Sequence, residues 1–324
     1  MREFSNLSFI RSSMHIQDRA FLLSKYLNLK NYEHISSKNF RLSNNIKLIL
    51  ISDYSSIRDL IIIFFFILYK KPKDVLVYTF ELYTITLSSL LSDFRILKIR
   101  FILKFFFKSL IRLAVLNIII KFYSSRIIVC SDLRKFFIKK KFKNKKVLVL
   151  NNRLIVEPNK NISQKINIKN FFLIVGNINN EIDFEKLCEF CYIYNFNIVI
   201  TAEIVNQNIL TKYAKIIKKK KYMGKKELFS YINNAYACCC FYVNHTLNQK
   251  YSASIKLYEY MFFDKLIIIS DNFGVNYELK KNNYIKYIKI SDLNEKRLKA
   301  TKKIKNTSSM SKISFQKELS SLSI

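Results

Sequence analysis

Short apolar runs alternate with longer amphipathic segments along almost the whole chain. The runs at residues 46–51 and 171–175 are typical, because each is rich in Ile, Leu or Phe and ends at polar or turn-forming residues. Segments with helical spacing follow them, at residues 56–71 and 184–194. Such an alternation favours parallel strands that are joined by crossover helices. The sequence therefore predicts an α/β protein built on parallel sheets.

The length of the chain bears on the number of domains. At 324 residues and 38.6 kDa it exceeds one compact core and suits two domains of about 150 residues each. Residues 156–170 contain Pro158 and many polar side chains, so we interpret them as a linker. We expect one domain over residues 1–155, a second over 156–300 and a tail over 301–324. Ligands of such sheets bind beyond the carboxyl ends of the strands. We therefore expect two Rossmann-like, doubly wound domains that face each other across a cleft.

The same patterns predict the individual elements. Expected strands are residues 7–11, 46–51, 74–80, 126–130 and 146–150 in the first half, and 171–175, 197–201, 220–223, 237–243, 266–270 and 285–289 in the second. Expected helices are residues 16–29, 56–71, 82–91, 100–122, 133–141, 184–194, 208–215, 226–235 and 254–263.

The chain contains only 3 glycines, in a composition that favours Lys, Ile, Asn and Phe. Gly176 closes the run 171–175, Gly224 precedes a helical pattern, and Gly274 follows the run 266–270. Glycine is special because it tolerates positive φ and lets another group approach closely. We predict that these positions meet geometric demands in one nucleotide-binding domain.

The charge is strongly basic, with 56 Lys and Arg against 23 Asp and Glu, a formal net charge of +33. Drift toward solvated lysine, an anionic membrane surface and nucleic acid each account for such an excess. No nucleic-acid-binding module is recognisable, so nucleic acid is not an expected partner. The basic, Phe-rich residues 100–112 are expected to lie on the anionic inner leaflet. A core-facing helix with a charged outer face is the alternative.

Hydropathy and cysteine usage indicate the compartment. The apolar, uncharged stretches at residues 60–69 and 82–92 are about half of the ~20 residues that a membrane-spanning helix needs, and the amino terminus lacks the apolar core of a signal peptide. The 6 cysteines are interpreted as reduced and buried, and Cys188 and Cys191 lack the second pair of a zinc site. We expect a cytoplasmic protein, peripheral to the inner face of the membrane, with no metal.

A helix start after residue 251 has the chemistry of an anion site. Ser252 and Ser254 are good N-cap residues, and free N–H groups at a helix start bind phosphate. Lys256 lies in the first turn, where a cation is unfavourable unless an anion is present, and Glu259 shares its face. The alternative is a surface Lys–Glu pair that contributes a few tenths of a kcal/mol.

One part of the chain resembles the nucleotide-sugar glycosyltransferases of the two-Rossmann-domain (GT-B) type, namely residues 254–261, followed by residues 265–271 and Gly274. The best match is to the group 1 or family 4 branch, whose pattern is "P-x-K-x-x-E-Y-M-x-x-G-K-P-V-I-x-S-D…G". Residues 172–176 and 221–237 resemble further segments of the donor domain, and 126–131 with 147–152 the end of the acceptor domain. The recognisable similarity covers roughly residues 120–280.

The resemblance implies that residues 1–155 form an acceptor-binding, membrane-facing domain and residues 156–300 a nucleotide-sugar-binding domain. It also implies roles for individual residues. Glu259 matches the glutamate that binds the ribose or sugar hydroxyls of the donor, Lys256 a basic position near the diphosphate, and Gly176 the tight turn at the floor of the cleft. Glu81 stands where many relatives carry a histidine, which makes it a catalytic candidate beside Glu259 and Lys256. The expected donor-binding residues are Gly176, Asn177, Gly224, His245, Ser252, Ser254, Lys256, Glu259 and Gly274, and His15 is expected on the acceptor side.

The sequence also departs from the family pattern. The first motif glutamate is Tyr251, the turn at residues 177–181 lacks the usual Arg and Lys, and residues 11–15 replace a glycine-rich loop. A catalytically degenerate scaffold or membrane-surface adaptor of the same fold is therefore an alternative to an active enzyme.

These observations lead to a functional hypothesis. We expect a retaining, metal-independent hexosyl- or glycosyltransferase that moves a sugar from a nucleotide diphosphate to a lipid-linked or cell-envelope glycan, as in polysaccharide or lipopolysaccharide biosynthesis. The nucleotide sugar is the donor substrate, and no cofactor is expected.

Overall fold

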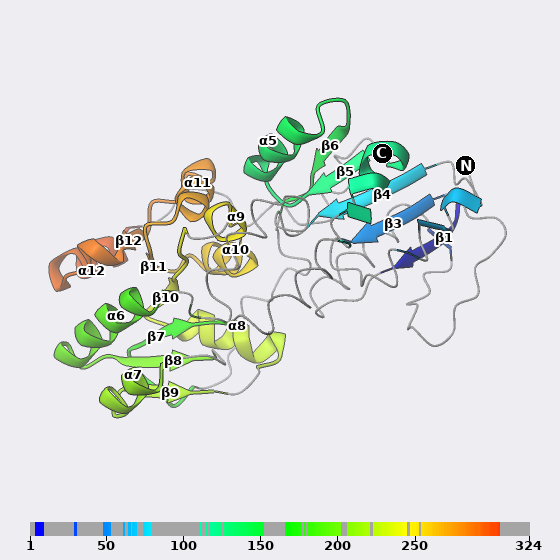
Figure 1. Cartoon of the computed structure of the whole chain (residues 1–324). Coiled ribbons are helices and arrows are strands. Elements are labelled where there is room, and N and C mark those ends of the chain that lie inside the picture. The colour runs from blue at the N-terminus through cyan, green and yellow to red at the C-terminus, as the bar shows by residue number, and fades with distance from the viewer. Residues whose placement is uncertain are drawn as a thin grey trace. The chain divides into compact units, whose positions relative to one another are not determined.

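The computed structural model describes two compact units of the chain. The described residues are 4–9, 29–30, 48–52, 61, 64–65, 67–69, 74–79, 111, 114–115, 117–124, 126–151, 166–176, 178, 180–201, 206–220, 223–244, 247–252 and 254–304. Unit 1 comprises residues 1–155 with 246–248 and 315–324, and unit 2 comprises residues 156–245 with 249–314 (Figure 1).

Unit 1 is built on a 6-stranded sheet in the order β2-β1-β3-β4-β5-β6, in which every pair of neighbours is parallel. The strands are β1 Phe4–Phe9, β2 Leu29–Lys30, β3 Leu48–Ser52, β4 Asp74–Thr79, β5 Arg126–Val129 and β6 Lys146–Val149. Parallel strands need crossover connections, which the alternating sequence supplies. A π-helix, η3 Ile119–Tyr123, precedes β5.

Helix α5 (Asp132–Lys141) connects β5 to β6. Ser131 is its N-cap, and the Ser131 side chain accepts a hydrogen bond from the backbone N–H of Arg134 at 3.3 Å. Ile138 is fully buried, and so are the three apolar residues of β5. The helix therefore packs one face toward the core and leaves its lysine-rich face to solvent.

Unit 2 contains a second 6-stranded parallel sheet, in the order β12-β11-β10-β7-β8-β9. Its strands are β7 Phe171–Ile174, β8 Asn197–Ile200, β9 Ile217–Lys219, β10 Ala237–Cys240, β11 Ile267–Ile269 and β12 Tyr287–Lys289. The helices are α6 Glu181–Ile193, α7 Gln207–Lys212, α8 Lys225–Asn234, α10 Ile255–Phe262, α11 Phe273–Lys281 and α12 Glu295–Lys302, with a 3-10 turn, η4 Ile290–Asp292, before α12. The short helix α9 Leu247–Lys250 has its first two residues in unit 1 and its last two in unit 2.

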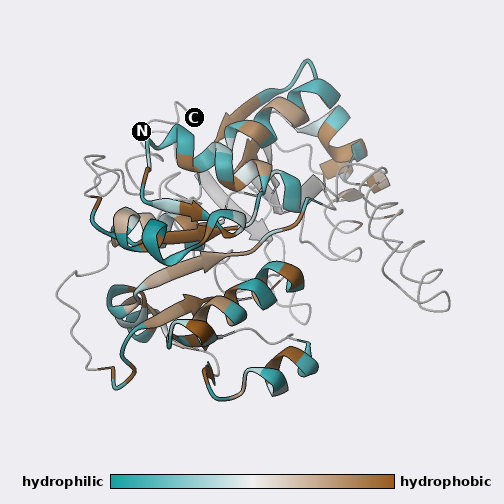
Figure 2. Ribbon diagram, turned by 90° about the vertical axis from the view of Figure 1, so that its left-hand side faces the viewer, coloured by the Kyte–Doolittle hydropathy of each residue, from teal (hydrophilic) through white to brown (hydrophobic). Residues whose placement is uncertain are grey.

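Burial explains why the strands of unit 2 could be read from the sequence. All four residues of β7, all four of β10 and all three of β11 are buried, so these strands are continuous apolar runs, as sheets covered on both faces require (Figure 2). The predicted α/β class with parallel sheets is confirmed.

The order of the strands creates a switch point in the sheet of unit 2. The connections from β7 lead outward to β8 and β9, whereas β10, β11 and β12 follow on the other side of β7. This is the doubly wound order 3-2-1-4-5-6, in which ligands bind at the carboxyl ends of the strands where the order reverses. The reversal lies between β7 and β10.

The element predictions failed in particular places. The predicted strand 220–223 is wrong, because the strand is Ile217–Lys219, whose Ile217 is buried while Lys218 and Lys219 are exposed. The first strand is Phe4–Phe9 instead of residues 7–11, and α9 was not predicted. Of the predicted helix 16–29 only Leu29 is described, and it lies in strand β2, whereas the predicted helix 82–91 lies outside the described residues.

Within the described part of the chain, no helix combines the length and the apolar character that crossing a bilayer would require.

Candidate functional site

The carboxyl edge of the unit 2 sheet carries a tight turn directly after β7. Gly176 has φ +71°, and its backbone N–H donates to Oγ1 of Thr201 at 3.0 Å, where Thr201 follows β8. The other described residues with positive φ are not glycines but Asn170, Asn195, Asn283 and Asp264. Since Asn and Asp tolerate this conformation, backbone geometry alone does not explain why Gly176 is a glycine.

The position of Lys256 explains it. A Cβ atom on Gly176 would lie 1.9 Å from Nζ of Lys256. The Lys256 ammonium donates to the backbone carbonyl of Val175 at 2.5 Å. A side chain at position 176 would displace the Lys256 ammonium, so the glycine leaves room for a cation from helix α10 on the turn.

Burial lowers the pKa of Lys256, and the nearby Cys240 and Glu259 oppose that shift. Burying an ammonium group is unfavourable unless hydrogen bonds or opposite charge compensate it. The ammonium at the end of β7 is thus a partly desolvated positive charge, of the kind that binds an anion strongly.

Helix α10 places Lys256 in its first turn and Glu259 one turn further on. Ser254 is the N-cap residue, but its side chain makes no capping hydrogen bond to the helix. Its hydroxyl instead accepts a hydrogen bond from the Tyr242 hydroxyl at 2.9 Å. The prediction of the helix start is correct, whereas the expected role of the Ser254 hydroxyl as a cap is wrong.

Glu259 is only 6% exposed. Its negative charge raises the pKa of Lys256 and that of the Cys240 thiol, so it lies close to both. Lys256 and Glu259 are three residues apart on one helix and therefore share a face. The alternative of a solvated surface pair does not describe this pair, because both side chains lie in or against the core.

Asn272 holds the segment that leads into α10. The side chain is fully buried, and its amide nitrogen lies 3.0 Å from the carbonyl of Val243, 3.1 Å from Oδ1 of Asn244 and 2.9 Å from the carbonyl of Gln249. Its Oδ1 accepts from the backbone N–H of Val275 at 3.0 Å and so caps α11. One amide side chain thus connects the end of β10, the end of α9 and the start of α11.

Gly274 lets α11 approach the same segment. A Cβ on Gly274 would lie 2.5 Å from the carbonyl oxygen and 2.6 Å from the nitrogen of Ser252. These are backbone atoms, which cannot move aside as the end of a side chain can. Gly176 and Gly274 therefore meet the predicted geometric demand. Gly224 does not, because a Cβ there would have no atom within 4 Å.

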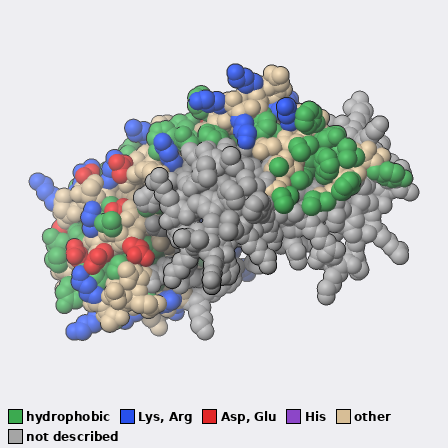
Figure 3. Space-filling model, in the orientation of Figure 1, with side chains coloured by type: hydrophobic (Ala, Val, Ile, Leu, Met, Phe, Trp, Pro, Cys, Tyr) green, Lys and Arg blue, Asp and Glu red, His purple; other side chains and the backbone are tan. Residues whose placement is uncertain are grey.

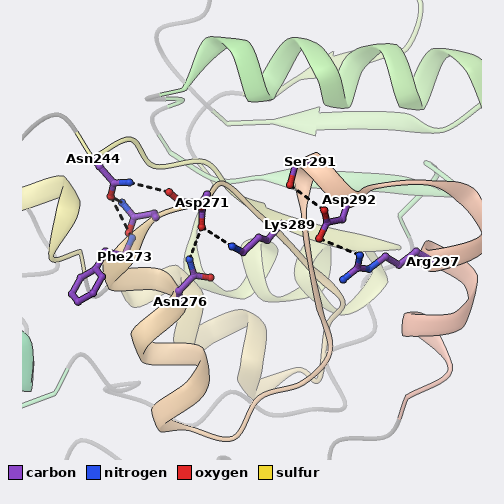
Figure 4. A network of polar contacts seen from close by, with 9 residues as sticks. Asn244, Asp271, Phe273, Asn276, Lys289, Ser291, Asp292 and Arg297 are labelled. Carbon is purple, nitrogen blue, oxygen red and sulfur yellow. Dashed lines mark hydrogen bonds and ion pairs between the residues drawn. The ribbon is translucent and has the colours of Figure 1, made fainter.

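An exposed polar network continues from this segment toward β12 (Figure 4). Asp271 accepts from Asn276 at 3.0 Å and forms an ion pair with Lys289 at 2.8 Å. The amide of Asn244 donates to the carbonyl of Asp271 at 2.9 Å. The ion pair lowers the pKa of Asp271. These contacts fix the turn between β11 and α11.

A second helix start lies at the same edge of the sheet. Asn180 is the N-cap of α6, its Oδ1 accepts from the backbone N–H of Asp183 at 3.2 Å, and its amide nitrogen lies 3.5 Å from Oγ of Ser270. The sequence analysis did not select Asn180, Thr201, Tyr242 or Asn272. Only Asn180 carried a signal, as an Asn three residues before an Asp at a helix start.

The structure brings together part of the predicted set. Gly176 contacts Lys256, and Gly274 lies against Ser252. Gly224 is an exposed N-cap residue of α8. Asn177, His245, His15 and Glu81 lie outside the described residues, so their expected roles stay predictions.

Of the cysteines, Cys240 ends β10 and lies near Lys256 at this edge. All six are free and buried. Burial raises the pKa of the Cys188 thiol to about 12, with Glu185 and Glu189 adding to the effect. Among the described residues, no group of three or more His, Cys, Asp or Glu side chains could hold a metal ion.

Comparisons with known proteins identify the fold. No protein-family model matches the chain, and no curated protein matches it in sequence. Among solved structures, WaaG, a glycosyltransferase involved in lipopolysaccharide biosynthesis, aligns with 97% of this chain and 90% of its own at 10% identity and a TM-score of 0.52. UDP-N-acetylglucosamine 2-epimerase from Rickettsia bellii aligns with 94% of this chain and 88% of its own, at 14% identity and a TM-score of 0.51.

At these identities the likeness establishes the fold and not the activity. The fold is that of the GT-B glycosyltransferases, which the sugar epimerase shares. The resemblance to this fold, which the segment around Lys256 and Glu259 carried in the sequence, is confirmed.

Proposed function

We propose that the protein is a glycosyltransferase that uses a nucleotide-diphosphate sugar as donor and a lipid-linked or cell-envelope glycan as acceptor. One observation carries the proposal: the Lys256 ammonium lies on the Gly176 turn, at the carboxyl end of β7 and next to the reversal of strand order. Nucleotide phosphates bind at such positions in doubly wound sheets.

In the proposed reaction the leaving diphosphate gains negative charge as the bond to the sugar breaks. Lys256 and the start of α10 would stabilise that charge. A preorganised cation in a partly desolvated site is effective because it needs little rearrangement when the charge develops. Glu259 would accept hydrogen bonds from hydroxyl groups of the donor. The reaction as proposed retains the anomeric configuration and needs no metal or cofactor.

Calorimetric titration with a panel of UDP-, ADP- and GDP-sugars tests the donor site. We expect one of them to bind, and Lys256→Ala to raise its dissociation constant about tenfold or more, because a charge-assisted hydrogen bond contributes roughly 1.5–3 kcal/mol. Lys265→Ala is the matched control. Lys265 is also largely buried and donates to the backbone carbonyl of Ala235 at 3.3 Å. It lies before β11, however, at the amino ends of the strands and away from the proposed donor site. Unchanged affinity in Lys256→Ala would remove Lys256 from the site.

Glu259 is tested by transfer. We expect Glu259→Ala to lose sugar transfer and to weaken donor binding. Because Glu259 is buried, Glu259→Gln serves as a second variant that keeps the volume of the side chain. Wild-type turnover in both variants would refute the role. The anomeric configuration of the product, read by NMR, tests retention.

Two alternatives predict other outcomes. The fold shared with the epimerase allows a reaction on the sugar nucleotide alone, so incubation with UDP-N-acetylglucosamine and no acceptor would change the sugar. A degenerate scaffold or membrane-surface adaptor, which Tyr251 in place of the first motif glutamate favours, would bind no member of the nucleotide-sugar panel.

We further propose that the protein works at the cytoplasmic face of an anionic membrane, where lipid-linked acceptors are found. The net charge of +33 supports this location. The predicted membrane segment at residues 100–112 lies outside the described residues, except for Ile111 at its end, which is 48% exposed.

A further inference from the structure

The outer face of α5 in unit 1 presents an aromatic ring among lysines. Phe136 is 76% exposed, although a phenyl ring in the middle of a helix normally faces the core. Lys139, Lys140 and Lys143 follow it at three, four and seven residues, and all three are exposed. The spacing of three and four residues places Lys139 and Lys140 on the same side of α5 as Phe136, and Lys143 lies just beyond the end of the helix at Lys141. We call these four residues the α5 surface.

The surroundings of the α5 surface are strongly basic. Residues 126–151 contain nine Lys and Arg residues against one acidic residue, Asp132, a net charge of 9 − 1 = +8. Among the described residues, no carboxylate forms an ion pair with a lysine of the α5 surface. Figure 3 shows Lys and Arg side chains gathered over α5 and β6. The charge is therefore available to an external partner.

A second exposed aromatic ring adjoins the same part of unit 1. Phe122 is 65% exposed, and the ammonium of Lys121 lies 5.2 Å from the centroid of its ring. Lys145 donates to the carbonyl of Ser124 at 2.7 Å, which ties the end of η3 to the turn between α5 and β6. Phe122 thus lies near the amino ends of β5 and β6, toward which α5 runs.

We propose that the α5 surface docks on an anionic phospholipid bilayer. An exposed phenyl ring gains free energy in the interfacial layer, while lysines around it are attracted to the headgroups. Lysine presents a hydrated point charge, which suits a fluid array of headgroups better than a fixed phosphate geometry. The proposal rests on the membrane location given above and not on the transfer reaction. It assigns the membrane contact to residues of α5 and of the turn that follows it.

This placement is compatible with ligand binding by unit 1. α5 covers the side of the sheet, and its basic end lies at the amino ends of β5 and β6. Ligands in doubly wound sheets bind at the carboxyl ends of the strands. The membrane contact and an acceptor site would therefore occupy different sides of unit 1.

Vesicle co-sedimentation of the full-length chain tests the proposal. Vesicles of phosphatidylcholine with phosphatidylglycerol should bind the protein, and vesicles of phosphatidylcholine alone should not. The triple variant Lys139→Gln, Lys140→Gln, Lys143→Gln should bind at least about tenfold more weakly, since each lysine near an anionic surface contributes appreciably. The control triple Lys218→Gln, Lys219→Gln, Lys226→Gln removes the same charge from exposed positions in unit 2 and should bind like wild type.

The aromatic part is tested separately at raised salt, where the electrostatic attraction is screened. Phe136→Ser should reduce binding about tenfold, whereas Ile193→Ser, which replaces a residue that is 68% exposed in α6, should leave it unchanged. Melting curves of all variants should match wild type, because the replaced side chains face solvent.

Three outcomes would overturn the proposal: unaltered binding by the α5 variants, equal loss in the control triple, or tighter binding to duplex DNA than to anionic vesicles at physiological salt. If the protein bound a nucleotide sugar but no vesicles, the membrane proposal would be wrong and the proposed transferase function would stand. If it bound vesicles through the α5 surface but no nucleotide sugar, the membrane proposal would stand and the proposed transferase function would be wrong.

Discussion

Lysine is used in opposite ways in the two units. Lys139, Lys140 and Lys143 of the α5 surface are exposed, whereas Lys256 in unit 2 is partly buried, with its ammonium against a backbone carbonyl and its pKa lowered. A compositional bias toward lysine explains the exposed lysines, because a solvated lysine has little energetic cost. It does not explain Lys256, since burying a cation is unfavourable. The local structure accommodates Lys256, above all through a glycine at position 176, and this arrangement supports the role proposed for this lysine.

The comparison predicts that substitutions at the carboxyl ends of the unit 2 strands lower the stability of the protein, while substitutions on the α5 surface change it little. The largest effect is expected for Gly274→Ala, because the new methyl group would overlap backbone atoms of Ser252. Forcing atoms into a packed site costs about 1–3 kcal/mol, and alanine is otherwise the better helix former. Denaturant unfolding would measure the loss. Gly224→Ala, where a Cβ meets open space, is the control and should change stability by under about 1 kcal/mol. Equal losses at both glycines would mean that close packing is not what distinguishes this edge.

A slightly smaller loss is expected for Asn272→Asp. The aspartate keeps the oxygen that caps α11, but it loses the amide that donates toward Val243, Asn244 and Gln249. Buried acceptors without a donor cost about 1–3 kcal/mol. We expect a lower melting temperature, together with weaker donor binding, because the segment before α10 is no longer held. Asn283→Asp makes the same change at an exposed position and should have little effect. If the two variants behaved alike, Asn272 would have no special part in holding the segment.

The smallest effect concerns pH. The folded-state pKa of Lys256 is lowered below its ordinary value of 10.5 by burial. Between the folded and unfolded pKa values the unfolded chain binds more protons, so stability rises with pH there. The increase in the free energy of unfolding is fully present above pH 10.5 and is lost as the pH falls through the folded-state pKa of Lys256. The difference in unfolding free energy between wild type and Lys256→Met should therefore increase from neutral to alkaline pH. The same difference for an α5 lysine such as Lys140→Met should not vary in this way, and a flat profile for Lys256 would contradict its burial.

The strands of unit 2 could be predicted because continuous burial leaves a continuous apolar run, as in β7 and β11. The edge strand β9 could not, because only Ile217 of its three residues is buried and its position follows from pairing with β8, where Ile217 lies opposite Ile198. Pairing of this kind is set by the tertiary structure and outweighs local preference.

The candidate site divides in the same way. The start of α10 could be predicted from the local sequence around Ser254, although the Ser254 side chain makes no capping hydrogen bond there. The contact between Lys256 and the carbonyl of Val175 joins residues 81 positions apart in the sequence, and only the crossover topology of unit 2 brings them together. The amide of Asn272 likewise meets groups more than 20 positions earlier in the chain. The residue types at a site can thus be found from sequence patterns, but the partners of each side chain cannot.

The short strand β9 has a consequence for how the protein behaves at high concentration. It is the outermost strand on one side of its sheet, with backbone groups that could pair with another copy of the chain. The exposed lysines Lys218 and Lys219 make that approach electrostatically unfavourable, and three residues offer little length for pairing. A chain so rich in Ile and Phe thereby keeps a free sheet edge from starting aggregation.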